Sequence, residues 1–179
     1  MSNVFLDRRF EEPLTDDDLV GMARDSSACF DLHRVDWQES FLSADRTRLL
    51  CHYRAPDAES VRTALRSLDA DMRVHWPGTV HDAPDRTPDE LLGANVIVLR
   101  SFDDPVALEE LQAVEDENIE CLETHRVRFM RTFFAADRKR MACLYDAPDA
   151  ESVRIVQRQA GMPYDSIWAF RRVTPDLID

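Results

Sequence analysis

The sequence is poor in lysine and glycine, with one lysine and four glycines among its 179 residues. Without clustered lysine and arginine the chain lacks the positive charge on which nonspecific nucleic-acid binding depends. The scattered glycines form no phosphate-binding loop, and neither Gly-x-Ser-x-Gly nor His-Glu-x-x-His occurs. We therefore expect no nucleic-acid partner, and the sequence assigns no catalytic or cofactor-binding residue.

The sequence also lacks an apolar run long enough to span a bilayer. Its first residues read Met-Ser-Asn-Val and show neither a basic region nor an apolar core of a signal peptide. We expect a soluble cytoplasmic protein with no membrane partner. The four cysteines show no Cys-x-x-Cys spacing, and a chain of this length can build a core without disulfides, so free thiols are expected. What the chain has in excess is acid: 35 acidic against 22 basic residues, a net charge of −13.

An internal repeat with a constant offset of 92 residues is the main feature of the sequence. Residues 45–62 read DRTRLLCHYRAPDAESVR, and residues 137–154 read DRKRMACLYDAPDAESVR. The same offset pairs Arg8 with Arg100, and Trp76 with Trp168, without a gap. Two homologous halves follow, which we assign to residues 1–76 and 95–179, with a linker at 77–94 that carries a short helix start at Thr87.

Each half is predicted to read strand, helix, strand, strand, helix, strand. Thr15 can cap the first helix, and Asp57 or Asp149 can cap the second, which ends near Asp69 or Gly161. Residues 43–46 and 135–138 are short enough to be hairpin turns. The remaining strands are predicted at 4–10, 35–42 and 49–53, at 96–102, 127–134 and 141–145, and around the two repeated tryptophans.

This order is the ferredoxin-like βαββαβ arrangement of an α+β protein, in which both helices cover one face of the sheet. The other face must also be covered. We therefore expect the two repeats to pack sheet to sheet as an intramolecular pseudo-dimer, a dimeric α+β barrel, and the chain to be a monomer of that kind or a homodimer.

Charge reverses between the repeats at three pairs of positions. One hypothesis is that some of the paired residues meet across the pseudo-twofold axis, Asp36 with Arg128 first of all. Independent drift of surface charges explains the reversals as well. The pairs are Asp36 and Arg128, Glu39 and Arg131, and Arg54 and Asp146.

The segment Cys-x-Tyr-x-Ala-Pro-Asp-Ala occurs twice, at residues 51–58 and 143–150, each time after a Phe-x-x-x-Asp hairpin. In this the chain resembles a family of small ferredoxin-like bacterial proteins that includes nickel-responsive, nickel-binding proteins. A single unit dimerises in that family, so the resemblance implies a fused dimer. It also implies nickel or another divalent metal as a ligand. No ligand set carries over, because Leu144 stands where the first copy has His52.

His33 and His125 are the histidines present in both halves, and each is followed by Arg-Val. Asp31 and Glu123 lie two residues before them, and imidazole with a carboxylate suits nickel, cobalt, zinc or copper. These two histidines are our metal candidates. The alternative is that each imidazole bonds a loop carbonyl at a helix-to-strand turn, and the absence of a spaced ligand motif favours it.

The remaining ligand-pocket candidates lie on the predicted strands. Cys51 and Tyr53, like Cys143 and Tyr145, alternate onto one face of a central strand, where the helix-facing core is the favoured placement and a cavity between the sheets the alternative. His52 points the opposite way. With Gln38 and His75 it forms a polar set that the second half lacks, which indicates either an asymmetric pocket or scattered interface replacements.

Three functions remain compatible with these features. The first is a noncatalytic protein that binds a metal or a small ligand. The second is a small cofactor-independent enzyme, similar to monooxygenases or isomerases, that uses the cavity between the sheets; fold analogy alone supports it. The third is an interaction module with an acidic surface. The sequence leaves the choice between enzyme and binding protein open.

Overall fold

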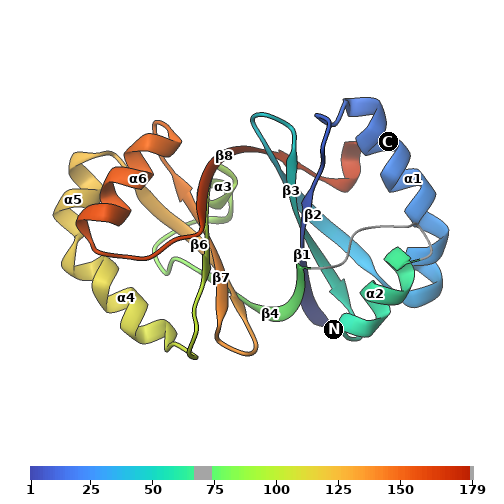
Figure 1. The fold of residues 1–179 in the computed structure, drawn as a ribbon, viewed down its shortest axis with the longest axis horizontal. Coiled ribbons are helices and arrows are strands. Elements are labelled where there is room, and N and C mark those ends of the chain that lie inside the picture. The colour runs from blue at the N-terminus through green and yellow to red at the C-terminus, as the bar shows by residue number, and fades with distance from the viewer. Residues whose placement is uncertain (67–73, 178–179) are drawn as a thin grey trace. The chain divides into compact units, whose positions relative to one another are not determined.

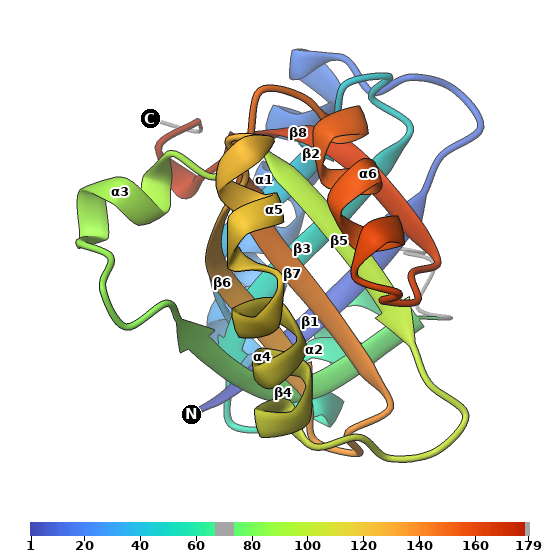
Figure 2. The same ribbon diagram turned by 90° about the vertical axis from the view of Figure 1, so that its left-hand side faces the viewer.

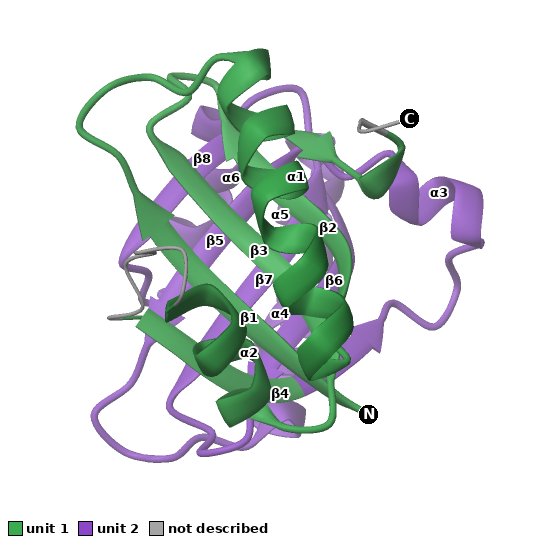
Figure 3. Ribbon diagram, turned by 90° about the vertical axis from the view of Figure 1, so that its right-hand side faces the viewer, with its two compact units in different colours: residues 1–78, 171–179 green, residues 79–170 purple. Residues whose placement is uncertain are grey.

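The computed structural model describes residues 1–66 and 74–177. The chain divides into two compact units, coloured separately in Figure 3. Unit 1 comprises residues 1–78 and 171–179, and unit 2 comprises residues 79–170. No helix in the described ranges is both long and apolar enough to cross a membrane.

Unit 1 contains a four-stranded antiparallel sheet with two helices on one face (Figure 1). Its strand order is β4-β1-β3-β2, the order of a ferredoxin-like fold. The elements are β1 (Ser2–Arg9), α1 (Asp16–His33), β2 (Asp36–Ser43), β3 (Arg48–Ala55), α2 (Ala58–Arg66) and β4 (Val74–Asp82), whose last residues belong to unit 2.

Unit 2 repeats this plan in the order β8-β5-β7-β6, and its helices again lie on one face of the sheet (Figure 2). Its elements are α3 (Pro88–Leu92), β5 (Val96–Ser101), α4 (Leu108–Glu117), α5 (Ile119–Thr124), β6 (Arg128–Ala135), β7 (Arg140–Asp146), α6 (Ala150–Gln159) and β8 (Ser166–Val173), whose last residues belong to unit 1. A 3₁₀ helix, Pro175–Leu177, follows in unit 1. The predicted fold class, an α+β chain of tandem ferredoxin-like repeats in the dimeric α+β barrel class, is confirmed.

Local sequence signals explain where the elements begin and turn. Thr15 forms a capping box with Asp18 at the start of α1, and Asp149 caps α6. Arg46 and Arg138 adopt the left-handed conformation, with φ of 62° and 60°, in the two predicted hairpin turns. Gly161, with φ of 66°, follows the end of α6. The other predicted helix end, Asp69, lies outside the described residues.

The first helix of the second repeat is interrupted, which the sequence pattern did not predict. Asn118 separates α4 from α5, and its amide donates to the carbonyl of Val114 at 2.7 Å. The corresponding residue in α1 is Ser26, whose hydroxyl donates to carbonyls of the preceding turn without ending the helix. An asparagine side chain that competes for backbone partners explains the break.

The compact units differ from the sequence repeats at their ends. Strand β4 continues through Pro77 to Asp82, within the segment expected to be a linker, and α3 begins in that segment with the expected capping box at Thr87. The last nine residues, expected in the second repeat, group with unit 1. Val173 is part of the hydrophobic core of unit 1, which explains this assignment.

Two of the three charge reversals have a local explanation within each repeat. Asp36 lies opposite Arg54 in the β2–β3 register. In unit 2 the signs are exchanged: Arg128 lies opposite Asp146, and their Nη2 and Oδ2 atoms are 2.5 Å apart. Because both members change sign together, each repeat keeps an opposite-charge pair across its hairpin.

Candidate functional site

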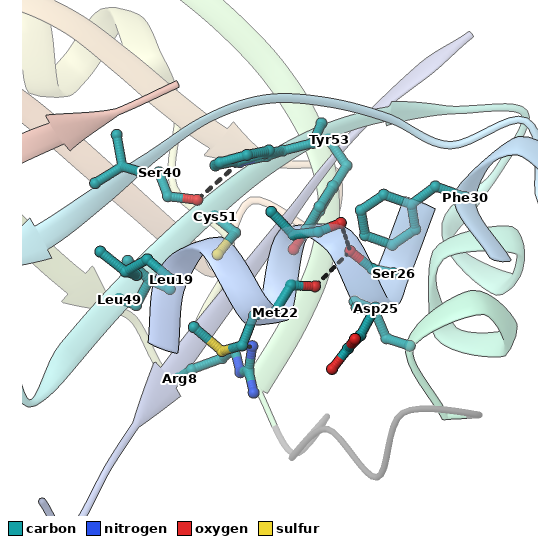
Figure 4. A pocket seen from close by; sticks show the side chains of 14 residues that line it. Arg8, Leu19, Met22, Asp25, Ser26, Phe30, Ser40, Leu49, Cys51 and Tyr53 are labelled. Atoms are coloured by element: carbon teal, nitrogen blue, oxygen red, sulfur yellow. Dashed lines mark hydrogen bonds between the residues drawn. The ribbon is translucent and has the colours of Figure 1, made fainter. Parts of the chain in front are cut away.

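A cavity of about 140 Å³ lies between α1 and the sheet of unit 1 (Figure 4). An engineered protein cavity of about 150 Å³ accommodates benzene, so this space suits a ligand with one small ring. Its walls are mostly apolar, with a few polar groups. The lining residues are Arg8, Leu19, Met22, Ala23, Asp25, Ser26, Phe30, Trp37, Ser40, Leu49, Cys51, Tyr53, Leu65 and Val173.

Strand alternation directs the polar groups of β1 and β3 into this space. Arg8 lies two residues after Leu6, which belongs to the core of unit 1, and therefore on the same face of β1. In the antiparallel register Arg8 lies opposite Leu49, and Leu6 lies opposite Cys51. Figure 4 shows Arg8, Cys51 and Tyr53 on the sheet side facing Met22 and Ser26 of α1.

The guanidinium of Arg8 has only weak partners among the described residues. Its Nη1 donates to Met22 Sδ at 3.6 Å, and its Cζ lies 5.0 Å from the centre of the Phe10 ring. Its Nε is buried without a hydrogen-bond partner in the described structure. A thioether sulfur is a poor acceptor, so this charge lacks a strong oxygen partner there.

Burial keeps the other two reactive groups of the cavity protonated. It raises the pKa of the Cys51 thiol, and it raises the pKa of the Tyr53 hydroxyl well above its ordinary value. A thiol in this state is neither a good nucleophile nor a ready metal ligand. Tyr53 remains a hydrogen-bond donor, with the Cys51 thiol as its polar neighbour.

The hydroxyl groups in the cavity wall already have partners. Ser26 Oγ donates to the carbonyl oxygens of Met22 and Ala23 at 2.8 and 3.0 Å. Ser40 Oγ accepts from Trp37 Nε1 at 2.9 Å. Of the oxygen and nitrogen donors on β1 and β3, Arg8 and Tyr53 have no oxygen partner among the described residues, and Asp25 of α1 adds an exposed acceptor.

The corresponding space in unit 2 measures only about 20 Å³, because a polar network fills it. Tyr145 donates its hydroxyl proton to Glu115 Oε1, and Gln157 Nε2 donates to the Tyr145 oxygen at 3.3 Å. Arg100, 1% exposed, donates through Nη2 to Gln157 Oε1 and through Nη1 to the Pro163 carbonyl, both at 2.6 Å. The tyrosine hydroxyl and both terminal nitrogens of the arginine thus have oxygen partners.

Two substitutions between the repeats change the polar groups around the shared arginine and tyrosine. At the offset of 92 residues, Ala23 corresponds to Glu115 and Leu65 to Gln157. Arg8 and Tyr53 correspond to Arg100 and Tyr145 and are unchanged in type. Unit 1 thus keeps the donors of the network and lacks the two side-chain oxygens that accept from them in unit 2.

The structure separates the predicted ligand residues into two groups. Cys51 and Tyr53 line the cavity of unit 1 on the helix-facing side, and Cys143 and Tyr145 are buried in the core of unit 2. Gln38, His52 and His75 do not line this cavity.

His52 lies on the opposite face of β3. Its Nε2 lies 2.9 Å from Asn3 Oδ1, and its ring stacks on Phe5 with 4.8 Å between centroids. Gln38 is exposed on β2, and His75 is half-buried on β4. These three residues therefore contribute nothing to the cavity beside α1.

The described residues do not fit a conventional metal site. They contain no group of three or more His, Cys, Asp or Glu side chains that could hold an ion. His33 is the last residue of α1, and His125 directly follows α5; both are half-buried. Burial also raises the pKa of the Cys143 thiol, as it does for Cys51. The assignment of His33 and His125 as metal ligands stays a prediction.

Sequence reasoning missed Arg8 as a site residue, and it missed the different residues that the two repeats carry at positions 23 and 65. The alternation of residues along the first strand could have identified Arg8. Arg8 continues the inward-facing alternation of Val4 and Leu6, and Arg100 does the same after Val96 and Val98. An arginine on the core face of a strand needs a buried partner, and only the structure identifies which residues provide it.

Comparison with known proteins adds the family and the fold. The family model described as "Nickel responsive protein SCO4226-like" matches residues 5–71 and 97–169. The crystal structure of SCO4226 from Streptomyces coelicolor A3(2) is 20% identical and covers 41% of this chain and 91% of its own, with a TM-score of 0.37. No curated protein sequence matches the chain.

Similarity to other solved structures extends over nearly the full length. A putative chlorite dismutase, TA0507, is 14% identical over 99% of this chain and 96% of its own, with a TM-score of 0.53, which shows a shared fold. A heme-binding protein from Thermus thermophilus is 8% identical over 99% of this chain and 93% of its own, with a TM-score of 0.49. Because the family model matches once in each repeat, the chain belongs to the SCO4226-like nickel-responsive protein family and contains two tandem copies of its unit.

Proposed function

We propose that this protein binds a small organic ligand in the cavity of unit 1, and that unit 2 is a copy whose equivalent site is filled by its own side chains. The contrast between the two cavities supports this. One space of about 140 Å³ is open and the other of about 20 Å³ is filled, although both are built from the same repeat. A pocket with apolar walls and a few convergent polar groups is typical of small-molecule sites.

The chemistry of the cavity favours binding over catalysis. Acid–base catalysis needs a group that can exchange a proton near the working pH. The raised pKa of Cys51 and that of Tyr53 leave both groups protonated. The cavity therefore supplies donors that can orient a ligand, and neither Cys51 nor Tyr53 supplies the acid–base group that the alternative of a cofactor-independent enzyme needs.

A cavity-filling substitution tests this proposal. Ala23→Leu extends a wall residue into the cavity, whereas Ala28→Leu adds the same volume at an exposed position of α1 that does not line it. Thermal-shift and calorimetric titrations with ring-sized probes should show binding to wild type and Ala28→Leu and its loss in Ala23→Leu. If no such probe, whatever its charge, binds wild type, the proposal is wrong.

Family membership favours nickel binding as a second candidate function. We propose His33 and His125 as its ligands, each imidazole being a suitable nickel donor. Metal analysis by mass spectrometry, followed by nickel, zinc and cobalt titration of wild type and the His33→Ala/His125→Ala variant, tests it. One or two ions per chain, lost in the variant, would support these ligands, and no uptake at micromolar metal would exclude them.

A further inference from the structure

We infer that the ligand of the unit 1 cavity is a small organic carboxylate, with one oxygen accepting from Tyr53 and the other paired with Arg8. This inference rests on the proposed function and specifies the chemical class of its ligand. The filled site of unit 2 carries the argument, because it contains the acceptors that the same donors use when the chain itself supplies them.

The first acceptor is a carboxylate. In unit 2 the Tyr145 hydroxyl donates to Oε1 of Glu115. In unit 1 the equivalent tyrosine, Tyr53, faces Ala23 and has no carboxylate partner among the described residues. A ligand oxygen that accepts from Tyr53 would replace the one that Glu115 provides to Tyr145.

The second acceptor is the partner of the arginine. Arg100 donates through Nη2 to Gln157 Oε1 at 2.6 Å. Leu65 stands at the equivalent position in unit 1 and has no oxygen, which leaves Arg8 with the Met22 sulfur at 3.6 Å. A carboxylate has two acceptor oxygens, so a single group can supply both missing acceptors.

The charges of the cavity favour an anion over a cation. Among the described residues, Arg8 and Asp25 are the charged ones in its lining. Asp25 is exposed, where water and salt screen its charge, whereas Arg8 is half-buried and its terminal nitrogen Nη1 donates to a sulfur, where the equivalent arginine of unit 2 donates to oxygen atoms. Hydrogen bonds between ionised groups are stronger where water is excluded. An amine would meet the Arg8 charge without finding a buried acceptor.

The apolar walls define the rest of the ligand. Leu19, Leu49 and Val173 leave space for a hydrocarbon body, and Phe30 packs edge-on against Tyr53 at 5.5 Å between centroids. A body of this kind gains free energy from burial, which an inorganic anion would not. The volume limits it to about one six-membered ring. Benzoate is therefore a suitable probe of the class.

Calorimetry with three probes of similar shape tests the inference: benzoate, benzamide and benzylamine at neutral pH. We expect benzoate to bind on the order of tenfold more tightly than benzamide, the scale of one charge-assisted contact. Arg8→Met, which keeps the apolar stem, and Tyr53→Phe should each reduce that preference, because a carboxylate forms a stronger hydrogen bond with either donor than an amide oxygen does.

The outcomes separate this inference from the proposed function. If benzamide binds wild type as tightly as benzoate, the cavity binds ligands and the carboxylate inference is wrong. If none of the three probes binds, both fail. An unchanged preference for benzoate in both Arg8→Met and Tyr53→Phe would also overturn the inference, since the contacts would then lie elsewhere.

A gain-of-site experiment in unit 2 gives independent evidence. The variant Glu115→Ala/Gln157→Leu recreates the side chains of unit 1 around Arg100 and Tyr145. We expect benzoate stoichiometry to rise from one to two per chain. Glu115→Gln, which keeps the side-chain volume, is the matched control and should remain at one. A folded double variant, verified by circular dichroism, that still binds one benzoate would contradict the inference.

Discussion

Glu115 occupies space beside Tyr145 that stays open beside Tyr53, where the equivalent residue is Ala23. Its carboxyl accepts a hydrogen bond from the Tyr145 hydroxyl and interacts electrostatically with Arg100. Burial still raises the pKa of Glu115 above its ordinary value, although the Tyr145 hydrogen bond and the Arg100 charge act to lower it. Burial of the Glu115 carboxyl in the filled site therefore disfavours its ionised form, a cost that does not arise at Ala23 in unit 1.

The raised pKa predicts how stability depends on pH. When folding raises the pKa of a carboxyl, the protonated group stabilises the folded state. This contribution is fully present below the pKa of the unfolded state and is lost as the pH rises through the pKa of the folded state. Glu115→Gln cannot ionise, so the free energy of unfolding of wild type should fall relative to that of the variant as the pH rises from about 4, near the unfolded pKa of glutamate, towards neutral. Chemical denaturation across this range measures it, with the exposed Glu117→Gln as control. If the difference in free energy of unfolding between Glu115→Gln and wild type does not change with pH, ionisation of Glu115 does not affect stability and the prediction is wrong.

At the scale of elements, the two hairpins keep the same cross-strand pair with opposite polarity. Arg128 of β6 binds Asp146 of β7, and the equivalent positions of β2 and β3 carry Asp36 and Arg54. Arg128 also lies 3.6 Å from Glu90, a residue of α3. The hairpin itself therefore requires only that the two paired residues have opposite charges. Neighbouring residues such as Glu90 determine which strand carries the positive member.

A double-mutant cycle separates these two preferences. Arg128→Asp should lower the free energy of unfolding by about 0.5–1 kcal/mol, because like charges then face each other on an exposed pair. Adding Asp146→Arg should restore part of this loss. Recovery should be incomplete, because Glu90 then faces an aspartate. Urea denaturation of the four proteins measures the coupling, and no recovery at all would contradict the hairpin interpretation.

At the scale of the whole molecule, the end of the chain belongs to the first unit. Val173 lines the unit 1 cavity and belongs to its core, and Arg172 pairs with the buried Glu39 through Nη1 and Oε2. Removal of one partner from a buried ion pair leaves an uncompensated charge. Arg172 and Val173 thus contribute to the core of unit 1 and to the wall of its cavity.

Two truncations test this assignment. A chain that ends at Phe170 lacks Arg172 and Val173, whereas one that ends at Thr174 keeps both. The shorter chain should lose about 3–5 kcal/mol of stability, from the loss of the buried Arg172–Glu39 pair and of the buried valine, and should not bind the cavity probes. The longer chain should resemble wild type in thermal melting and in binding. Equal stability of the two truncated chains would contradict the assignment.

The architecture was predictable because its signals are local and occur twice. Thr15, Asp149 and the hairpin turns act within a few residues, and the offset of 92 residues doubled the information for each strand. The break at Asn118 was not predicted, because a single asparagine leaves the apolar periodicity intact while its amide competes for a helix carbonyl.

The sequence by itself determined the repeat, the order of helices and strands, and the facing of Cys51 and Tyr53 to one side of a strand, because periodicity and capping are properties of neighbouring residues. Only the tertiary structure decided that Arg8, Ala23, Tyr53 and Leu65 surround one space and that Glu115 and Gln157 fill its counterpart. The physical reason is that a cavity depends on volumes and charges contributed by segments distant in sequence. A local sequence pattern does not indicate whether side chains from such distant segments lie next to one another.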